Sequence, residues 1–144
     1  MHLPGPVLIV CSDPECSSML LGVIKDYGLE ASAAADIRQA RTHLQKPDLS
    51  LVLCESHLPD GSFRDLFDAS AVRTTPLRFV VLVRDEDGYS EAMRLGAFEA
   101  IPTPCRRSDV QWTMIRALRK PENPARLRRG LIEGFGGATD PRKK

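Results

Sequence analysis

Short apolar segments alternate with amphipathic segments along the whole first part of the chain. Apolar runs bounded by turn residues are typical of strands that are buried on both faces of a parallel sheet. The clearest run ends at Glu55, just before the turn residues 59–61. Five such segments are predicted as strands: residues 7–10, 29–35, 49–54, 79–83 and 97–101.

The segments between the predicted strands carry apolar residues at intervals of three and four, which predicts amphipathic helices. Three of these helices have a recognisable first residue, because Asp13, Asp36 and Ser62 can each cap a helix N-terminus. Gly28 suits the end of the first helix. The predicted inner faces contain Met19, Leu20, Val23, Ile24 and Tyr27, then Ile37, Ala40 and Leu44, and then Phe63, Leu66, Phe67 and Ser70.

Two further helices are predicted in the second half of the chain. The charged residues 84–88 are expected to form a solvated loop that leads into a short helix ending at Gly96. The last helix is expected to begin at Ser108 and Asp109, with Trp112 off its apolar stripe and exposed. The predicted inner faces are Ala92, Met93 and Leu95 for the fourth helix, and Val110, Met114, Ile115 and Leu118 for the fifth.

The alternation of strands and helices predicts an α/β fold with right-handed crossovers. Five strands of this length favour a flavodoxin-like, doubly wound parallel sheet in the order 2-1-3-4-5, with helices on both faces. We expect residues 1–120 to form this domain and residues 121–144 to form a flexible basic tail. Residues 120–144 hold seven Lys and Arg against three Asp and Glu.

Composition narrows the classes of function. The formal net charge of +1 argues against a nucleic-acid-binding protein. The chain has neither an apolar run of about 20 residues nor a signal-peptide pattern, so we expect no membrane contact and a cytoplasmic location. The four cysteines lack CxxC spacing and are predicted to be reduced thiols, and the three histidines share no metal-ligand spacing.

Five local motifs, taken in order, resemble response-regulator receiver domains. They are Val7–Val10 with Asp13-Pro14, then Pro47-Asp48 through Leu58-Pro59-Asp60-Gly61, then Pro76 with the run 79–83, then Leu95-Gly96-Ala97-Phe98, and finally Thr103-Pro104. The resemblance covers residues 7–120. It implies the receiver fold and a phosphoacceptor pocket at the carboxyl edge of the sheet.

The same resemblance implies that this pocket is degenerate. The family's two metal-holding acidic residues correspond to Cys11 and Ser12, and its phosphate-accepting Asp corresponds to Glu55. Its hydroxyl residue and its Lys correspond to Val83 and Thr103, and its aromatic switch residue falls on Ala100. Mg²⁺ prefers oxygen ligands, and a phosphoryl group needs a charge clamp. We therefore expect no active catalytic residue, no enzyme activity, no metal and no cofactor.

The predicted function is that of a phosphorylation-independent protein-interaction module in two-component-type signalling. Receivers use their fourth helix, fifth strand and fifth helix for partner contact, so the resemblance implies this face for a protein partner or for a homodimer. Trp112 and three arginines, Arg106, Arg107 and Arg116, are the candidate contact residues. No small-molecule substrate is expected.

Two alternatives stay open. One is an atypical phosphoacceptor that uses Glu55 with Mg²⁺ bound through Asp13, although the order Asp-Pro-Glu favours a helix cap for Asp13. The other is a thiol-based redox sensor at Cys11, although the charge of Glu55 should raise the pKa of that thiol. Cys54 is expected to point away from the pocket as a core residue. Glu55 itself could imitate a phosphorylated Asp only in part, because a carboxylate carries a single charge.

Overall fold

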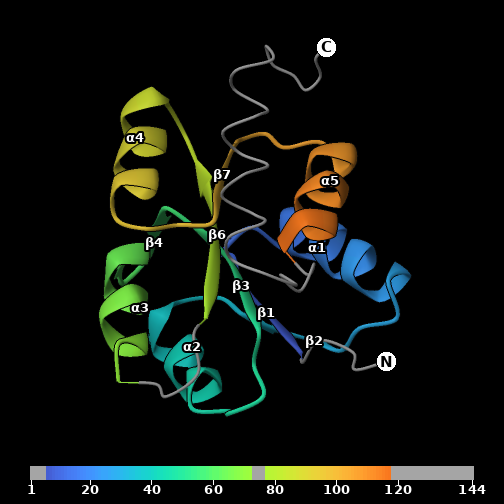
Figure 1. Cartoon of the computed structure of the whole chain (residues 1–144), viewed down its shortest axis with the longest axis horizontal. Coiled ribbons are helices and arrows are strands. Elements are labelled where there is room, and N and C mark those ends of the chain that lie inside the picture. Colours follow the sequence, from blue (N-terminus) through green and yellow to red (C-terminus); the bar gives the residue numbers. More distant parts are fainter. Residues whose placement is uncertain (1–5, 73–76, 118–144) are drawn as a thin grey trace, which may run out of the picture.

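A five-stranded parallel sheet runs through the centre of the molecule (Figure 1). The computed structural model describes residues 6–72 and 77–117 of the 144-residue chain. The strand order β2-β1-β3-β6-β7 is the predicted 2-1-3-4-5 order of the flavodoxin-like fold, so this prediction is confirmed. The strands are β1 (Val7–Val10), β2 (Ala31–Ala34), β3 (Leu51–Glu55), β6 (Arg78–Val83) and β7 (Glu99–Pro102).

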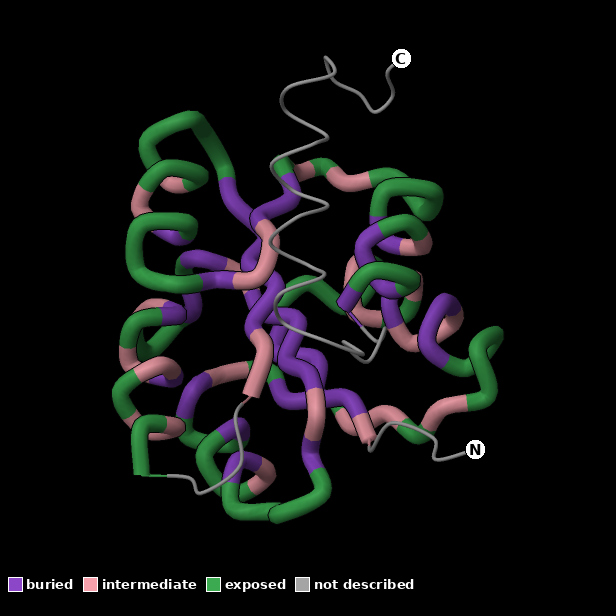
Figure 2. The backbone as a smooth tube through the Cα atoms, in the orientation of Figure 1, coloured by how far each residue is buried: buried purple, intermediate pink, exposed green. Residues whose placement is uncertain are grey.

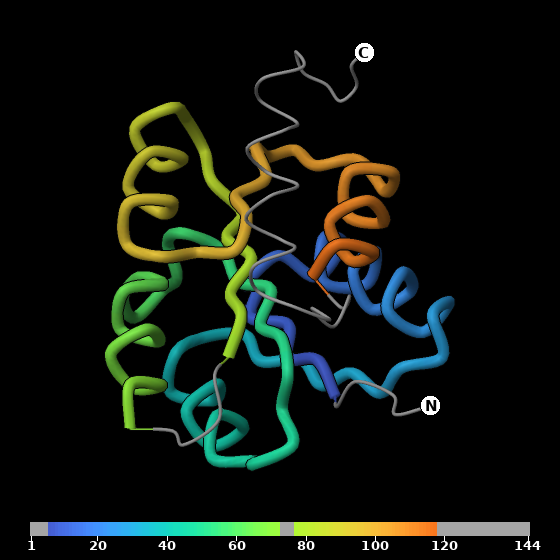
Figure 3. Tube along the Cα trace, in the orientation of Figure 1, coloured from blue at the N-terminus to red at the C-terminus, as the bar shows by residue number. Residues whose placement is uncertain are grey.

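Helices cover both faces of this sheet (Figures 1 and 3). One face is covered by α2 (Ile37–Leu44), α3 (Phe63–Ser70) and α4 (Glu86–Arg94), and the other by α1 (Pro14–Asp26) and α5 (Arg107–Ala117). Successive strand residues therefore pack into two separate cores, with Val7 and Ile9 on the α1/α5 side and Leu8 and Val10 on the other. The strands form the buried centre of the molecule (Figure 2).

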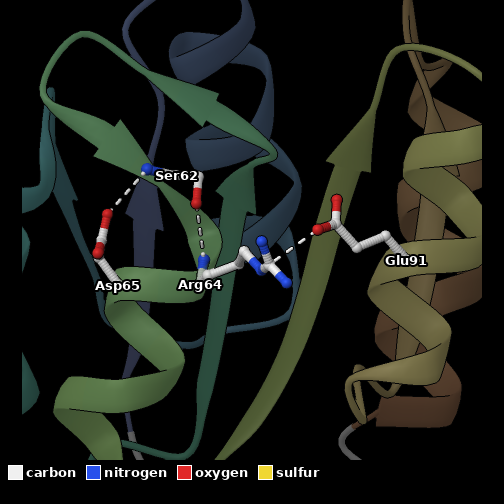
Figure 4. Close-up of polar contacts among 4 residues, drawn as sticks. All are labelled: Ser62, Arg64, Asp65 and Glu91. Atoms are coloured by element: carbon white, nitrogen blue, oxygen red, sulfur yellow. Dashed lines mark hydrogen bonds and ion pairs between the residues drawn. The ribbon is translucent and has the colours of Figure 1, made fainter.

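The predicted helix caps are present. The Asp13 side chain accepts a hydrogen bond from Glu15 N, and the Asp36 side chain accepts one from Gln39 N. Ser62 and Asp65 form a reciprocal capping box at the start of α3 (Figure 4). In the same view Arg64 reaches from α3 to Glu91 of α4, with Nε and Oε2 3.2 Å apart.

A small hairpin after β3 was not predicted. Its strands are β4 (His57–Leu58) and β5 (Gly61–Ser62), which pair antiparallel around the turn expected at residues 59–61. The Asp60 carboxylate accepts hydrogen bonds from Ile37 N at 2.9 Å and from Arg38 N at 3.1 Å. The hairpin is thereby attached to the N-terminus of α2, where backbone N–H groups lack partners within the helix.

The prediction of a loop over residues 84–88 is wrong. Helix α4 begins at Glu86, and the Asp85 side chain caps it by accepting a hydrogen bond from Gly88 N at 2.8 Å. Acidic residues are stabilised in the first turn of a helix by its dipole, so Glu86 and Asp87 belong to the helix rather than to a loop.

Several predicted inner-face residues are also exposed. Met93, Leu95 and Ile115 have 37%, 39% and 45% of their surface exposed. Thr113, which was not predicted as a core residue, is buried on the inner face of α5 together with Val110, Met114 and Ala117. Three strands also begin two residues later than predicted, β2 at Ala31, β3 at Leu51 and β7 at Glu99, although Leu49 is buried.

The predictions on Leu118, on the domain boundary at residue 120 and on the tail over residues 121–144 lie outside the described residues. The same holds for His2 and Pro76. Within the described part of the chain, no helix is both long enough and apolar enough to cross a membrane.

Candidate functional site

A cavity of about 500 Å³ opens at the carboxyl edge of the sheet, where the sequence predicted the site. Three segments meet there: the start of α1, the end of β3 and the loop between β7 and α5. Of the predicted pocket residues, Asp13, Glu55 and Thr103 line the cavity. The sequence did not predict the rest of the lining, which consists of Glu15, Cys16, Met19, Pro104 and Cys105.

Glu55 is held by Ser12. Its Oε1 atom accepts one hydrogen bond from the Ser12 backbone N–H at 2.8 Å and another from the Ser12 hydroxyl at 2.9 Å. The two residues follow adjacent strands, because β1 pairs with β3 and Val10 lies beside Cys54. The two hydrogen bonds from Ser12 fix the direction of the Glu55 carboxylate.

Asp13 acts as the helix cap that the sequence favoured. One carboxylate oxygen accepts a hydrogen bond from Glu15 N at 3.2 Å, and Pro14 occupies the first turn of α1. The Asp13 backbone carbonyl accepts a hydrogen bond from the Cys11 thiol, with the two atoms 3.5 Å apart. The local chain therefore satisfies both Asp13 groups without a metal ion.

Thr103 does not point into the cavity as a free hydroxyl donor. Its hydroxyl donates a hydrogen bond to Val83 O at 3.0 Å, and its backbone N–H donates to the same carbonyl at 2.8 Å. The Thr103–Pro104 peptide bond is cis. The turn before α5 is thus fastened to the end of β6 by two hydrogen bonds.

The remaining predicted pocket residues lie beneath the cavity rather than in its wall. Val83 and Ala100 are buried in the core on the α2/α3/α4 side, and Cys11 is buried in the core on the α1/α5 side. Cys54 is fully buried in the first of these cores, as predicted. The cavity wall therefore has no group from Val83 or Ala100 that could contact a ligand.

Three thiols gather beside the cavity. Cys16 lies between the other two, and its side chain acts to lower the pKa of Cys11 and of Cys105. Burial is the main reason why the pKa values of Cys11, Cys16 and Cys105 lie above the ordinary value of 9.0. The charge of Glu55 also raises the pKa of Cys11, as predicted, but it contributes less than burial.

The cavity residues do not suit Mg²⁺. Mg²⁺ needs several oxygen ligands in an octahedral arrangement. At this site Asp13 caps α1, and one oxygen of Glu55 already accepts two hydrogen bonds from Ser12. Within residues 6–72 and 77–117, no three His, Cys, Asp or Glu side chains are arranged to hold a metal ion.

The predicted contact residues divide between two sides of α5. Trp112 is 66% exposed, as its position off the apolar stripe predicted. Arg116 lies one turn further along and forms an ion pair with Glu99 of β7, with the atoms 3.1 Å apart. Arg107 instead faces α1, where it pairs with Asp26 and lies over Gly22. Arg106 is exposed just before the helix begins.

Two curated regulatory proteins are similar in sequence to this chain. The chain is 29% identical over 120 residues to the response regulator protein PilR of Pseudomonas aeruginosa, and 29% identical over 116 residues to the transcriptional regulatory protein CitB of Klebsiella pneumoniae. These matches cover 80% and 78% of this chain, but only 27% of PilR and 50% of CitB. The chain thus spans about half or less of these relatives. No family model matches it.

Solved structures decide the fold. A CheY-like response-regulator receiver domain protein from Methanospirillum hungatei superposes with a TM-score of 0.70, over 79% of this chain and 93% of that one, at 19% identity. The chain has the CheY-like, flavodoxin-like fold of receiver domains. The beryllofluoride-activated NtrC4 receiver domain dimer gives a TM-score of 0.71 at 19% identity, over 78% of this chain and 95% of that chain.

The chain has the scaffold of this fold, and Asp13, Glu55 and Thr103 lie at the carboxyl edge of its sheet. The sequence identified the positions of Glu55, Asp13 and Thr103 because they follow buried strands or begin a helix. It missed Cys16 and Cys105 as cavity residues, because they come from segments far apart in the chain. Their only signal in the sequence is that each lies a few residues from a predicted pocket residue.

Proposed function

We propose that this receiver domain acts in two-component-type signalling by binding a protein partner, without phosphoryl transfer of its own. The observation that carries the proposal is the pairing of Glu55 with Ser12, whose N–H and hydroxyl both donate to the same carboxylate oxygen. In receivers with phosphoryl transfer, the corresponding region holds a metal ion beside an Asp. Here the carboxylate is already bound by neutral donors from the neighbouring strand end.

The groups that would stabilise a phosphoryl transition state are missing as well. Such stabilisation comes from cations and donors aimed at the developing charge, and removing one donor costs about 10²–10³ in rate. Thr103 carries no charge, and its hydroxyl donates to Val83 O. Val83 offers only an apolar, buried side chain. The expected rate of phosphorylation is therefore far below that of a receiver with acidic residues and Lys.

The proposed partner surface is the β7-facing side of α5, with Trp112 at its centre and Arg116 beside it. Exposed Trp and Arg residues are enriched among those that dominate binding energy at protein interfaces. Arg106 and Ile115 are exposed on the same element or next to it. A partner with an apolar pocket and carboxylates would match this combination.

A homodimer that forms through α4, β7 and α5 is the second kind of complex that we propose, beside a complex with a different protein. The NtrC4 receiver is a dimer in its beryllofluoride-activated form. Tyr89 and Met93 of α4 are exposed apolar residues at a spacing of four, which places them on one side of that helix. Sedimentation of the chain with and without Trp112→Ala distinguishes the homodimer from a complex with another protein.

Incubation with acetyl phosphate and MgCl2, followed by intact-mass measurement, tests the first half of the proposal. We expect no phosphoryl adduct, while a receiver with the usual acidic residues is modified under the same conditions. An adduct on the wild-type chain that Glu55→Gln removes would overturn the proposal and establish the atypical phosphoacceptor instead.

Affinity capture with the immobilised chain tests the second half. Trp112→Ala should weaken binding of a captured protein, or of the second copy, by about 2 kcal/mol, or roughly thirtyfold in Kd. Val72→Ala is the matched control, because Val72 is an apolar residue with 87% exposure that follows α3 on the opposite face of the sheet. Equal losses for the two variants would contradict a role for the α5 surface.

A further inference from the structure

Cys16 and Cys105 are brought together at the cavity although they come from different elements. Cys16 lies in the first turns of α1, and Cys105 lies in the turn between β7 and α5. Both line the same cavity, both are partly exposed, and the Cys16 side chain is close enough to lower the pKa of Cys105. Neither residue has a part in the proposed protein interaction.

The third thiol of the group is less accessible. Cys11 is only 4% exposed, is absent from the cavity lining and donates its S–H to the Asp13 carbonyl. A reagent that enters the cavity therefore reaches Cys16 and Cys105 before it reaches Cys11. Cys54 is fully buried on the other face of the sheet.

We propose that Cys16 and Cys105 form a reversible disulfide across the mouth of this cavity when the chain meets a small disulfide oxidant such as glutathione disulfide. The bond would join the start of α1 to the turn that leads into α5. This proposal does not depend on the protein-interaction proposal.

The reaction follows ordinary thiol–disulfide exchange. The Cys105 thiolate attacks one sulfur of the oxidant, the S–S bond of the oxidant breaks, and one small thiolate leaves. The Cys16 thiol then loses its proton and attacks the Cys105 sulfur of the mixed disulfide, so that the second small thiolate leaves. The two released thiolates take up the two protons lost by the cysteines. The protein pair is oxidised by two electrons, and the oxidant is reduced to two thiols.

Cys105 is the first nucleophile in this scheme for a physical reason. Burial raises the pKa of both thiols, and the neighbouring Cys11 raises that of Cys16 further. The neighbouring Cys16 side chain has the opposite effect on Cys105, whose pKa it lowers. The neutral disulfide carries no such burial penalty. Oxidation should therefore be slow at neutral pH and should accelerate by up to about tenfold per pH unit as thiolate forms.

The test uses the full 144-residue chain, kept dilute and incubated in defined mixtures of reduced and oxidised glutathione. Remaining free thiols are alkylated before the chain is denatured and digested. Cleavage after Glu15 separates Cys11 from Cys16, so that the peptide pairs are distinguishable by mass. We expect a Cys16–Cys105 cross-linked peptide that is lighter by two hydrogen atoms than the two free peptides together and that disappears on reduction.

Cys16→Ser and Cys105→Ser should each abolish this peptide, and Cys105→Ser should also abolish glutathionylation at the cavity. Cys11→Ala is the matched control within the group and should leave the cross-link intact. When the chain is unfolded in urea, the Cys16–Cys105 cross-link should no longer form in preference to other cysteine pairs. A Cys11–Cys16 bond instead, a glutathione adduct that never resolves, or an equal yield in urea would overturn the proposal.

Discussion

Glu55 and Ser12 join the ends of two neighbouring strands through a single carboxylate oxygen, which accepts hydrogen bonds from the Ser12 N–H and from its hydroxyl. A carboxylate held in this way has one fixed direction at the cavity. A phosphorylated residue, in contrast, would carry a larger charge and three acceptor oxygens.

The first prediction concerns this pair. Ser12→Ala removes the hydroxyl donor and keeps the N–H donor, so the free energy of unfolding should fall by only about 0.5–1 kcal/mol at this exposed position. Glu55→Ala removes both bonds and should cost more than Ser12→Ala, whereas Glu55→Gln keeps an acceptor oxygen and should cost less than Glu55→Ala. Urea unfolding monitored by circular dichroism gives the three values. Equal effects of Glu55→Gln and Glu55→Ala would show that the hydrogen bonds do not account for the stability.

A second prediction separates the capping role of Asp13 from metal binding. Asp13→Ala should reduce stability by about 1 kcal/mol, because Glu15 N loses its acceptor, while Asp13→Asn should retain most of that stability. Thermal unfolding with and without MgCl2 is the measurement. Stabilisation of the wild-type chain by Mg²⁺ that is lost in Asp13→Asn would contradict the cap as the sole role of this residue.

The third prediction is a pH dependence at Asp60. Hydrogen bonds from Ile37 N, and then from Arg38 N, hold the pKa of Asp60 below its ordinary value of 3.8. A depressed pKa in the folded chain means that the contribution of Asp60 to stability is complete above about pH 4 to 5 and disappears as the pH falls through the lower, folded value. Urea midpoints measured from pH 6 down to pH 3 should fall less steeply for Asp60→Asn than for the wild-type chain. Parallel curves would contradict this contribution.

The fourth prediction compares two glycines with positive φ. A methyl group on Gly28 (φ 75°) would meet no atom within 4 Å, so Gly28→Ala should cost only the backbone penalty of about 1–2 kcal/mol. A methyl group on Gly61 (φ 155°) would approach Ile37 Cδ1 to 2.6 Å and would collide with the Asp65 carboxylate of the capping box. Gly61→Ala should therefore be the more destabilising substitution, which urea unfolding of the two variants will show.

The fold could be read from the sequence because its determinants are local. The buried run before Glu55, the caps at Asp13 and Asp36, and Gly28 each identify the beginning or end of an element without knowledge of any distant contact. The order of the strands was then predicted from the number and length of the strands, which favour the flavodoxin-like arrangement.

Two kinds of structural detail could not be predicted from the sequence. Acidic residues occur both in loops and at helix N-termini, so residues 84–88 fit either structure until the Asp85 cap is seen. The meeting of Cys16 with Cys105, and of Glu55 with Ser12, depends on where loops at one sheet edge turn their side chains. Spacing along the chain carries no information about those directions.

Thr103 connects the cavity to the helix that bears Trp112. Its hydroxyl and its N–H both donate hydrogen bonds to the last carbonyl of β6, and these bonds anchor the turn into α5 to the sheet. Under the proposed function, this anchor would hold α5 in one orientation, and regulation would come from the amount of the protein or from the choice of partner.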